Sequence, residues 1–190
     1  MRVITGTARG RKLKTPAGYD IRPTTDNVKE ALFNIIQFDV EGRRVLDLFA
    51  GTGQLGIECL SRGAASAVFV DQSREALRIV GENLKACGLQ GKLCQMDALR
   101  FLQQAESFDL IFVDPPYDAN LYISVLKCIN SVDILSEGGI IVCEARSGES
   151  LPAMEPPYRK GKEYRYGKVK IAMYTKEGNR DENCDMPGQL

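Results

Sequence analysis

The stretch VLDLFAGTGQLG at residues 45–56 decides the fold class of this chain. Its first five residues are apolar except for Asp47, and they predict a buried strand. Glycines follow at the spacing G-x-G-x-x-G, and residues 54–62 have the spacing of a helix. A glycine-rich turn between a buried strand and a helix is typical of the first unit of a nucleotide-binding α/β sheet.

The chain beyond this stretch keeps alternating between strands and helices. The predicted strands are 67–70, 92–95, 110–113 and 139–144, and the predicted helices are 73–87, 98–104 and 121–132. This rhythm indicates a doubly wound, mostly parallel α/β sheet of Rossmann-like fold. Such sheets bind ligands at the carboxyl ends of their strands. The residues that end or closely follow these strands are Asp47, Gly51, Asp71, Asp97 and Asp114.

The two ends of the chain differ from this central part. Residues 1–25 predict a small basic β extension with glycine turns, before a helix that Thr25, Asp26 or Asn27 can cap. Residues 26–176 form the predicted catalytic domain, in which 168–175 is the last strand. The polar residues 177–190 predict a disordered tail.

The amino-acid composition of the chain excludes several classes of protein and of catalytic site. The chain has 190 residues, 44% of them hydrophobic and 26% charged, which is ordinary for a single globular domain. No apolar run is long enough to span a bilayer and the N-terminus has no signal-peptide core, so we expect a cytoplasmic protein. Histidine is absent, which excludes His-dependent triads and His-ligated zinc. The six cysteines form no CxxC pair, so we expect neither a metal site nor disulfides.

Positive charge is concentrated near both ends of a chain whose net charge is zero. Residues 1–25 contain six basic side chains and one acid, and residues 158–170 have the same balance. The two stretches indicate a polyanionic partner if they share a face. The alternative is that they are edge strands whose charges prevent aggregation.

The ligand of the glycine loop has two candidates. Asp71 lies 20 residues after Gly51, which matches the dinucleotide fingerprint and makes an NAD oxidoreductase a serious alternative. Asp47 argues against NAD, because a carboxylate beside a pyrophosphate is unfavourable. It suits a ligand with an ammonium and a sulfonium, such as S-adenosylmethionine. Asp97 adds a carboxylate for an adenine amino group, and its alternative role is to cap the helix at Ala98.

The strand at 110–113 ends in Asp114-Pro115-Pro116-Tyr117, the most specific signal in the sequence. The exocyclic amine of a base is a poor nucleophile, because its lone pair is delocalised into the ring. Asp114 and a backbone carbonyl fixed by the prolines can accept its two N–H groups, and Tyr117 offers a stacking face. The alternative is a turn that merely ends a strand, which the glycine loop on the first strand makes less attractive.

With these residues in place, the chain resembles the S-adenosylmethionine-dependent methyltransferases with a [D/N]PP[Y/F] motif. Within that class it is similar to the bacterial family that methylates guanine N2 in 16S ribosomal RNA. The resemblance rests on RVITGTARGRKLKTP, RPTTDNVKEALFN, VLDLFAGTGQLGIECLSRGA, FDLIFVDPPY and LSEGGIIVCE, spread over residues 1–145. It implies that 16S rRNA, in a small-subunit particle, is the partner.

The resemblance also implies roles for individual residues. The implied catalytic residues are Asp114, Pro115, Pro116 and Tyr117. The implied cofactor-binding residues are Arg22, Thr25, Asp47, Phe49, Gly51, Gly53, Asp71, Asp97 and Ala98. The implied RNA-binding residues are Arg9, Arg11, Lys12 and Lys14. The segment KVKIAMY departs from the family pattern, which often has an acid and a threonine there.

Two further alternatives share the fold. One is an adenine-N6 or other amino-methyltransferase acting on DNA or RNA, and Asp rather than Asn at position 114 favours guanine N2 over it only by family analogy. The other is an RNA-binding factor without catalytic activity, which the intact glycine loop and tetrapeptide disfavour.

Overall fold

The computed structural model describes residues 1–15, 26–116 and 121–177. The helices are α1 (Asp26–Ile35), α2 (Gln54–Ser61), α3 (Arg74–Cys87), α4 (Ala98–Leu102) and α5 (Tyr122–Val132). The strands are β1 (Arg44–Asp47), β2 (Ser66–Asp71), β3 (Lys92–Gln95), β4 (Phe108–Val113), β5 (Leu135–Arg146), β6 (Tyr158–Tyr166) and β7 (Val169–Lys176).

The strands form one seven-stranded sheet in the order β3-β2-β1-β4-β5-β7-β6. The five strands β1 to β5 are parallel, while β7 pairs antiparallel with both β5 and β6. The predicted doubly wound, mostly parallel α/β sheet is therefore confirmed. The order reverses between β1 and β4, which is where sheets of this type hold their ligands.

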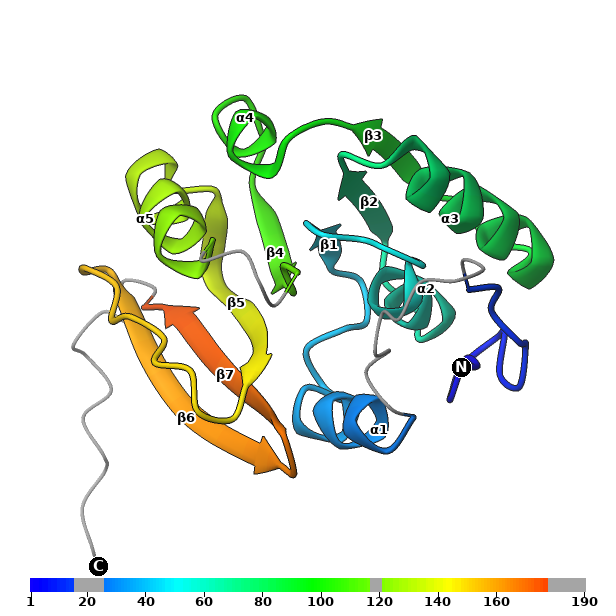
Figure 1. The fold of residues 1–190 in the computed structure, drawn as a ribbon, viewed down its shortest axis with the longest axis horizontal. Helices are drawn as coiled ribbons and strands as arrows, with labels where there is room; N and C mark the ends of the chain where they lie inside the picture. Colours follow the sequence, from blue (N-terminus) through cyan, green and yellow to red (C-terminus); the bar gives the residue numbers. More distant parts are fainter. Residues whose placement is uncertain (16–25, 117–120, 178–190) are drawn as a thin grey trace, which may run out of the picture.

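Helices cover both faces of the sheet, as Figure 1 shows. One buried cluster joins α1, α2 and α3 to side chains such as Val45, Phe69 and Phe112. The other joins α4 and α5 to Leu46, Ile111 and similar residues. Val45 and Leu46 are consecutive and point to opposite faces, because side chains alternate along a strand. Asp47 therefore faces the side of α1 to α3, together with Phe112, its register partner on β4.

Local capping explains where α3 begins and ends. The Ser73 hydroxyl accepts the N–H of Ala76 at 3.2 Å, which satisfies one of the free donors of the first turn. Gly88 follows the last turn in the left-handed conformation with φ 67°, as the sequence predicts. α4 ends at Leu102, two residues before its predicted end.

The N-terminal segment is less regular than predicted. The sequence predicts short strands here, but residues 1–15 contain an isolated bridge between Arg2 and Lys12 in place of a strand ladder. Val3, Ala8 and Leu13 join the same apolar cluster as α1 to α3, so the segment packs on the sheet domain. Backbone hydrogen bonds within the segment, from Val3 N–H to the Arg11 carbonyl and from Gly10 N–H to the Val3 carbonyl, both at 2.9 Å, act together with packing and with hydrogen bonds to α2.

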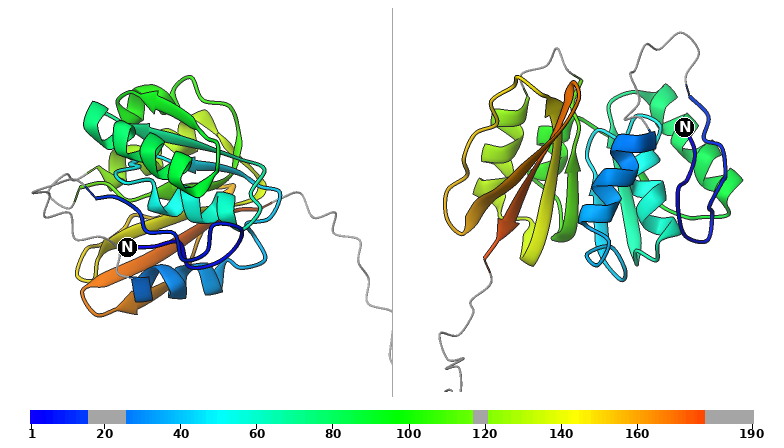
Figure 2. Two further views of the ribbon diagram at one scale, coloured as in Figure 1. Left: turned by 90° about the vertical axis from the view of Figure 1, so that its right-hand side faces the viewer. Right: turned by 90° about the horizontal axis from the view of Figure 1, so that it is seen from below.

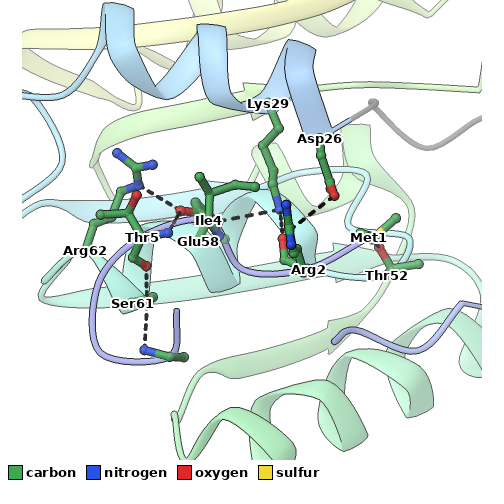
Figure 3. A network of polar contacts seen from close by, with 12 residues as sticks. Met1, Arg2, Ile4, Thr5, Asp26, Lys29, Thr52, Glu58, Ser61 and Arg62 are labelled. Atoms are coloured by element: carbon green, nitrogen blue, oxygen red, sulfur yellow. Dashed lines mark hydrogen bonds and ion pairs between the residues drawn. The ribbon is translucent and has the colours of Figure 1, made fainter. Parts of the chain in front are cut away.

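Glu58 of α2 binds the backbone of this segment and so connects it to the sheet domain (Figure 3). Its carboxylate accepts the backbone N–H of Ile4 at 2.8 Å and of Thr5 at 3.0 Å. Arg62 Nε lies 2.9 Å from one carboxylate oxygen and Lys29 Nζ lies 3.5 Å from the other. The side chains of Glu58 and Lys29 are fully buried, so this is a compensated ion pair inside the protein.

The two basic stretches lie at opposite ends of the sheet. Lys14 at the end of the N-terminal segment contacts α3, beside β2 and β3, while β6 is the edge strand at the other end. Figures 1 and 2 show the same separation. The described part of the first stretch and the strand β6 are therefore separated by the width of the sheet. Residues 158–166 form a mostly exposed edge strand, which is the alternative given above for the second basic stretch.

The helices of the described residues include none that is long and apolar enough to cross a membrane. The predicted tail lies outside the described residues except for Glu177.

Candidate active site

The carboxyl edge of the parallel strands gathers the acids that the sequence analysis singles out. Asp47 ends β1 and Asp71 ends β2, while Asp114 directly follows β4. In register, Asp47 lies opposite Phe69 of β2 and Phe112 of β4, so these acids are within a few residues of one another across neighbouring strands. The fold thus places them where the glycine loop leaves the sheet.

The glycine loop needs its glycines at two positions. Gly51 and Gly53 have φ of 54° and 76°, a region that L side chains rarely adopt. A Cβ on Gly53 would also lie 3.0 Å from Cγ1 of Val80, whereas at Gly51 it would meet little beyond the Phe49 carbonyl oxygen at 4.0 Å. The loop therefore approaches α3 on one side and leaves open space beside Gly51.

Asp71 braces this loop. One carboxylate oxygen accepts the N–H of Gly51 at 2.9 Å, and the other accepts the N–H of Ser73 at 2.8 Å. The carboxylate lies between the glycine loop and the start of α3, and it is half-buried. Each oxygen has further lone pairs, so ribose hydroxyls can still bind it.

Asp97 is placed differently from the other acids. Its side chain accepts the N–H of Arg100 at 3.0 Å and the Nε2–H of Gln72 at 2.8 Å. It therefore caps α4, which is the alternative role given above, and it is exposed at the carboxyl end of β3. Contact with an adenine amino group stays a prediction. Ala98 is buried and Phe49 is half-buried in the same apolar cluster, so a ligand could contact only a small part of either side chain.

Asp47 is buried, with an exposed fraction of 3%. Its carboxylate accepts the N–H of Gly56 at 3.0 Å, and this bond links the end of β1 to α2. Burial raises the pKa of Asp47 to about 7, against the lowering effect of the Gly56 bond, and the charge of Asp71 raises it further. Among the described residues, no cation lies against this carboxylate.

Asp114 has the same electrostatic character. Burial raises its pKa well above the ordinary value, and the charges of Glu144 and Asp47 add to the shift. Pro115 is buried and Pro116 is exposed, which fixes the chain direction directly after β4. Tyr117, the last residue of the tetrapeptide, lies outside the described residues, as do Arg22 and Thr25.

The site fits a cationic nucleoside ligand better than a pyrophosphate. The carboxyls of Asp47 and Asp114 have raised pKa values and stand where a positive charge would stabilise their ionised forms. The buried Oε1 of Gln54, at the first position of α2, has no hydrogen-bond partner among the described residues. A ligand donor at the glycine loop would satisfy it. The residues that line this edge therefore suit S-adenosylmethionine.

The predicted RNA-binding residues divide into two groups. Arg9, Arg11 and Lys12 are exposed, and in the described part of the chain no ion pair holds their side chains. Lys14 is exposed but pairs with Glu82 of α3 at 2.8 Å. They lie on the N-terminal segment, at the side of the domain that carries α2 and α3 (Figure 2).

Sequence reasoning missed two residues near the site. Asn83 of α3 is buried, donates to the carbonyl of Thr52 in the glycine loop at 2.9 Å and accepts the N–H of Lys14 at 2.7 Å. A buried Asn on an apolar helix face is the signal that could have found it. Glu144 of β5 is 3% exposed and acts on the pKa of Asp114. Its signal was an acid at the end of a fully apolar strand. In the part of the chain that the structure describes, no cluster of acids and cysteines is able to hold a metal ion.

A sheet of this order, with a glycine loop after β1 and an acid at the end of β2, belongs to the Rossmann-like class of methyltransferase folds. The family model described as Conserved hypothetical protein 95 matches residues 1–175, and the chain belongs to this family.

Named relatives agree with this class. The chain is 41% identical over 184 residues to YlbH of Bacillus subtilis, which has a provisional rRNA methyltransferase name, covering 94% of this chain and 100% of that protein. It is 31% identical to ribosomal RNA small subunit methyltransferase D of Escherichia coli, covering 97% and 94%. The solved structure of Escherichia coli yhhF, provisionally called a methyltransferase, superposes with a TM-score of 0.84 at 32% identity, covering 93% and 98%.

Proposed function

We propose that this protein transfers a methyl group from S-adenosylmethionine to the exocyclic N2 of a guanine in 16S ribosomal RNA. The observation that carries the proposal is the position of Asp114. It directly follows β4, the neighbour of β1, so it adjoins the strand that leads into the glycine loop. An amine acceptor and a cofactor loop on neighbouring strands are what methyl transfer to an amine requires. The substrate class is supported by the rRNA names of two relatives, 41% and 31% identical, which this chain matches over nearly their whole length.

The cofactor would be held along the strand ends. S-adenosylmethionine supplies an electrophilic methyl group on a sulfonium. Asp47 faces its positively charged methionine end, and Gly51 allows the loop backbone to approach it closely. Asp71 accepts from the ribose hydroxyls and Asp97 from the adenine amine. Arg22, Thr25, Phe49, Gly53 and Ala98 complete the proposed cofactor site.

Asp114 and the Pro115 carbonyl would hold the amine. Each accepts one N–H, which orients the nitrogen and draws electron density toward it. Asp114 is suited to take the proton that the nitrogen loses, because burial and neighbouring acids raise its pKa. Pro116 fixes the turn and Tyr117 stacks on the base. Most of the rate gain then comes from positioning and electrostatics in a closed site.

The basic N-terminal segment would contact the RNA. Arg9, Arg11 and Lys12 are exposed without ion pairs among the described residues, so they are available to phosphates. Lys14 can join them if phosphate displaces its partner Glu82. The substrate is then the 16S rRNA in a small-subunit particle, and the enzyme works in the cytoplasm with those particles.

The test is methyl transfer from labelled S-adenosylmethionine to unmodified 16S rRNA, both naked and in small-subunit particles. Digestion to nucleosides is expected to give labelled N2-methylguanosine. N6-methyladenosine would replace guanine by adenine as the target. An absence of transfer to both substrates, by protein that binds S-adenosylhomocysteine, would contradict the proposal. Titration with NADH is the control for the oxidoreductase alternative, and we expect no binding.

A further inference from the structure

The turn between β6 and β7 lies at the carboxyl edge of the sheet, the edge that carries the candidate active site. β5 runs parallel to β4 and β7 runs antiparallel to β5, so β7 begins where β5 ends. Val169 at the start of β7 is accordingly in register with Arg146 at the end of β5 and with Tyr166 at the end of β6. The right-hand view of Figure 2 shows this turn at the top, in orange. Residues 162–168 are the hairpin tip.

The hairpin tip presents two tyrosines on the face of the sheet to which Asp47 points. Tyr164 is in register with Ile171, a member of the apolar cluster on that face. Ile171 is in register with Glu144 of β5, which is level with Asp114. Neighbouring strands lie about 4.8 Å apart, which places Tyr164 about 14 Å from Asp114 along one row of the sheet. Tyr166 follows two residues later, on the same face and nearer the carboxyl edge.

These two tyrosines differ from three others in the described residues. Tyr122, Tyr158 and Tyr174 are buried, and each donates its hydroxyl to a backbone carbonyl. Tyr164 and Tyr166 are half-buried, and neither hydroxyl has a hydrogen-bond partner in the described part of the chain. The ring of Tyr166 packs in part against the apolar cluster that contains α1, so its position is supported from below. Partly exposed and supported rings are suitable surfaces for base stacking.

The positive charges of β6 and its turn divide according to their distance from the site. At the end of β6 far from the carboxyl edge, Arg159 pairs with Glu177 at 3.1 Å and Lys160 pairs with Glu163 at 2.9 Å. The exposed cations of the hairpin tip, which have no ion pair among the described residues, are Lys162, Arg165 and Lys168. Protection of an edge strand requires charge alone and gives no reason for aromatic rings beside it. The unpaired cations therefore coincide with the tyrosines and with the ligand edge.

Single-stranded RNA has the chemistry that this combination fits. Aromatic rings stack on unpaired bases, and neighbouring cations bind the phosphates between them. An acidic protein surface would satisfy the cations but would leave the two rings without a specific role. A base whose amine reaches Asp114 must leave its stack, so the nucleotides beside it lose a stacking partner. A distance of about 14 Å is one that a few nucleotides of single strand can span.

We propose that the hairpin tip binds the single-stranded RNA next to the target nucleotide, with bases stacked on Tyr164 and Tyr166 and phosphates bound by Arg165 and Lys168. This inference rests on the proposed function and adds to it a second RNA contact, across the sheet from the N-terminal segment. The hairpin tip holds the flank of the target while Asp114 engages the amine.

Stacking is tested by changing the rings and keeping the rest of the protein. Affinity is measured for naked unmodified 16S rRNA and for unmodified small-subunit particles, with S-adenosylhomocysteine present. The variant with both Tyr164→Ala and Tyr166→Ala is expected to bind the preferred of these two at least about tenfold more weakly. The variant with Tyr164→Phe and Tyr166→Phe keeps both rings and is expected to stay within about twofold of wild type. Because Tyr166 packs on the apolar cluster, Tyr164→Ala alone and an unchanged affinity for S-adenosylhomocysteine serve as checks on folding.

The phosphate contacts are tested through the salt dependence of binding. The variant with Arg165→Gln and Lys168→Gln is expected to bind the same RNA more weakly, with the slope of log affinity against log salt reduced by about one for each cation. Arg159→Gln is the matched control, because Arg159 is an exposed cation of the same strand that is already paired with Glu177. It is expected to keep the wild-type affinity and slope.

The inference is overturned if the double alanine variant binds S-adenosylhomocysteine and RNA as tightly as wild type. It is also overturned if the double phenylalanine variant loses as much affinity as the alanine variant, or if the wild-type protein binds neither RNA nor particles. These measurements need no methyl transfer, so the proposed function fails separately. Wild-type protein that binds through the hairpin tip and yields no N2-methylguanosine would contradict that function and leave the RNA contact in place.

Discussion

Two groups of buried or half-buried carboxylates face the same side of the sheet, and they differ in whether cationic side chains lie against them. Glu58 of α2 receives two backbone N–H groups and lies against Lys29 and Arg62. Asp47 and Asp114 at the carboxyl edge have no cation against them among the described residues, and their pKa values are raised. An acid with cationic partners inside the protein has a structural role, whereas poorly solvated acids without such partners are candidates for binding a cationic ligand. The comparison separates a structural anchor from a candidate binding site without reference to any relative.

The strongest way to break this comparison is to remove the charge of Asp114. Asp114→Asn is expected to reduce the methyl-transfer rate by about 100-fold or more, because the amine loses an ionised acceptor. The free energy of unfolding at pH 8 is expected to rise. The pKa of Asp114 is higher in the folded than in the unfolded chain, so its ionisation as the pH rises opposes folding. Single-turnover kinetics and urea denaturation measure the two effects.

Asp109, at the other end of β4, is the matched control. Burial opposes its ionisation, but hydrogen bonds and the charge of Arg44 outweigh this and lower the pKa of Asp109 to about 2. Its carboxylate therefore stabilises the fold above the unfolded pKa, and that stability is lost as the pH falls. Asp109→Asn should lose stability and keep the transfer rate. If the two variants shifted stability in the same direction, the distinction between the groups would fail.

Removing Glu58 tests the structural group. Glu58→Gln is expected to lower the free energy of unfolding by about 3 kcal/mol, because it leaves the buried Lys29 without its counter-charge. Burial already lowers the pKa of Lys29, against the raising effect of Glu58. Urea denaturation measures the loss, and Glu75→Gln, which breaks an exposed pair with Arg78, should change stability little. A Glu58→Gln protein as stable as wild type would show that the network does not anchor the N-terminal segment.

The smallest effect is expected from the pH dependence of cofactor binding. Because the pKa of Asp47 is about 7 in the free protein, a cationic ligand must displace its proton at lower pH. The affinity for S-adenosylmethionine is then expected to fall about fivefold between pH 7 and pH 6, with proton release on binding. Calorimetry in buffers of different ionisation enthalpy measures both quantities. Asp47→Asn should weaken binding and flatten this slope, and an affinity independent of pH in the wild-type protein would argue against Asp47 as a cofactor contact.

Much of the site was accessible to sequence reasoning because its signals are local. The glycine loop, the strand before it and the helix after it occupy adjacent residues, so periodicity and glycine spacing predict them together. The acids at the strand ends follow from the same rule, since parallel strands deliver their last residues to one edge. The strand β6 could be given only as an alternative, because its exposed, basic pattern differs little from that of a loop.

The sequence by itself determined the fold class, the ligand edge of the sheet and the Asp-Pro-Pro-Tyr tetrapeptide, because each depends on residues that are neighbours in the chain. The tertiary structure alone decided which acids are compensated. Glu58 meets Ile4 and Thr5, which precede it by 54 and 53 residues, and Asn83 meets Lys14 across 69 residues. It also decided that Glu144 stands beside Asp114, since strand register is set by packing of the whole sheet. The burial of a charged group and the identity of its partners depend on the whole fold. These two properties distinguish a structural acid such as Glu58 from the acids of the candidate site.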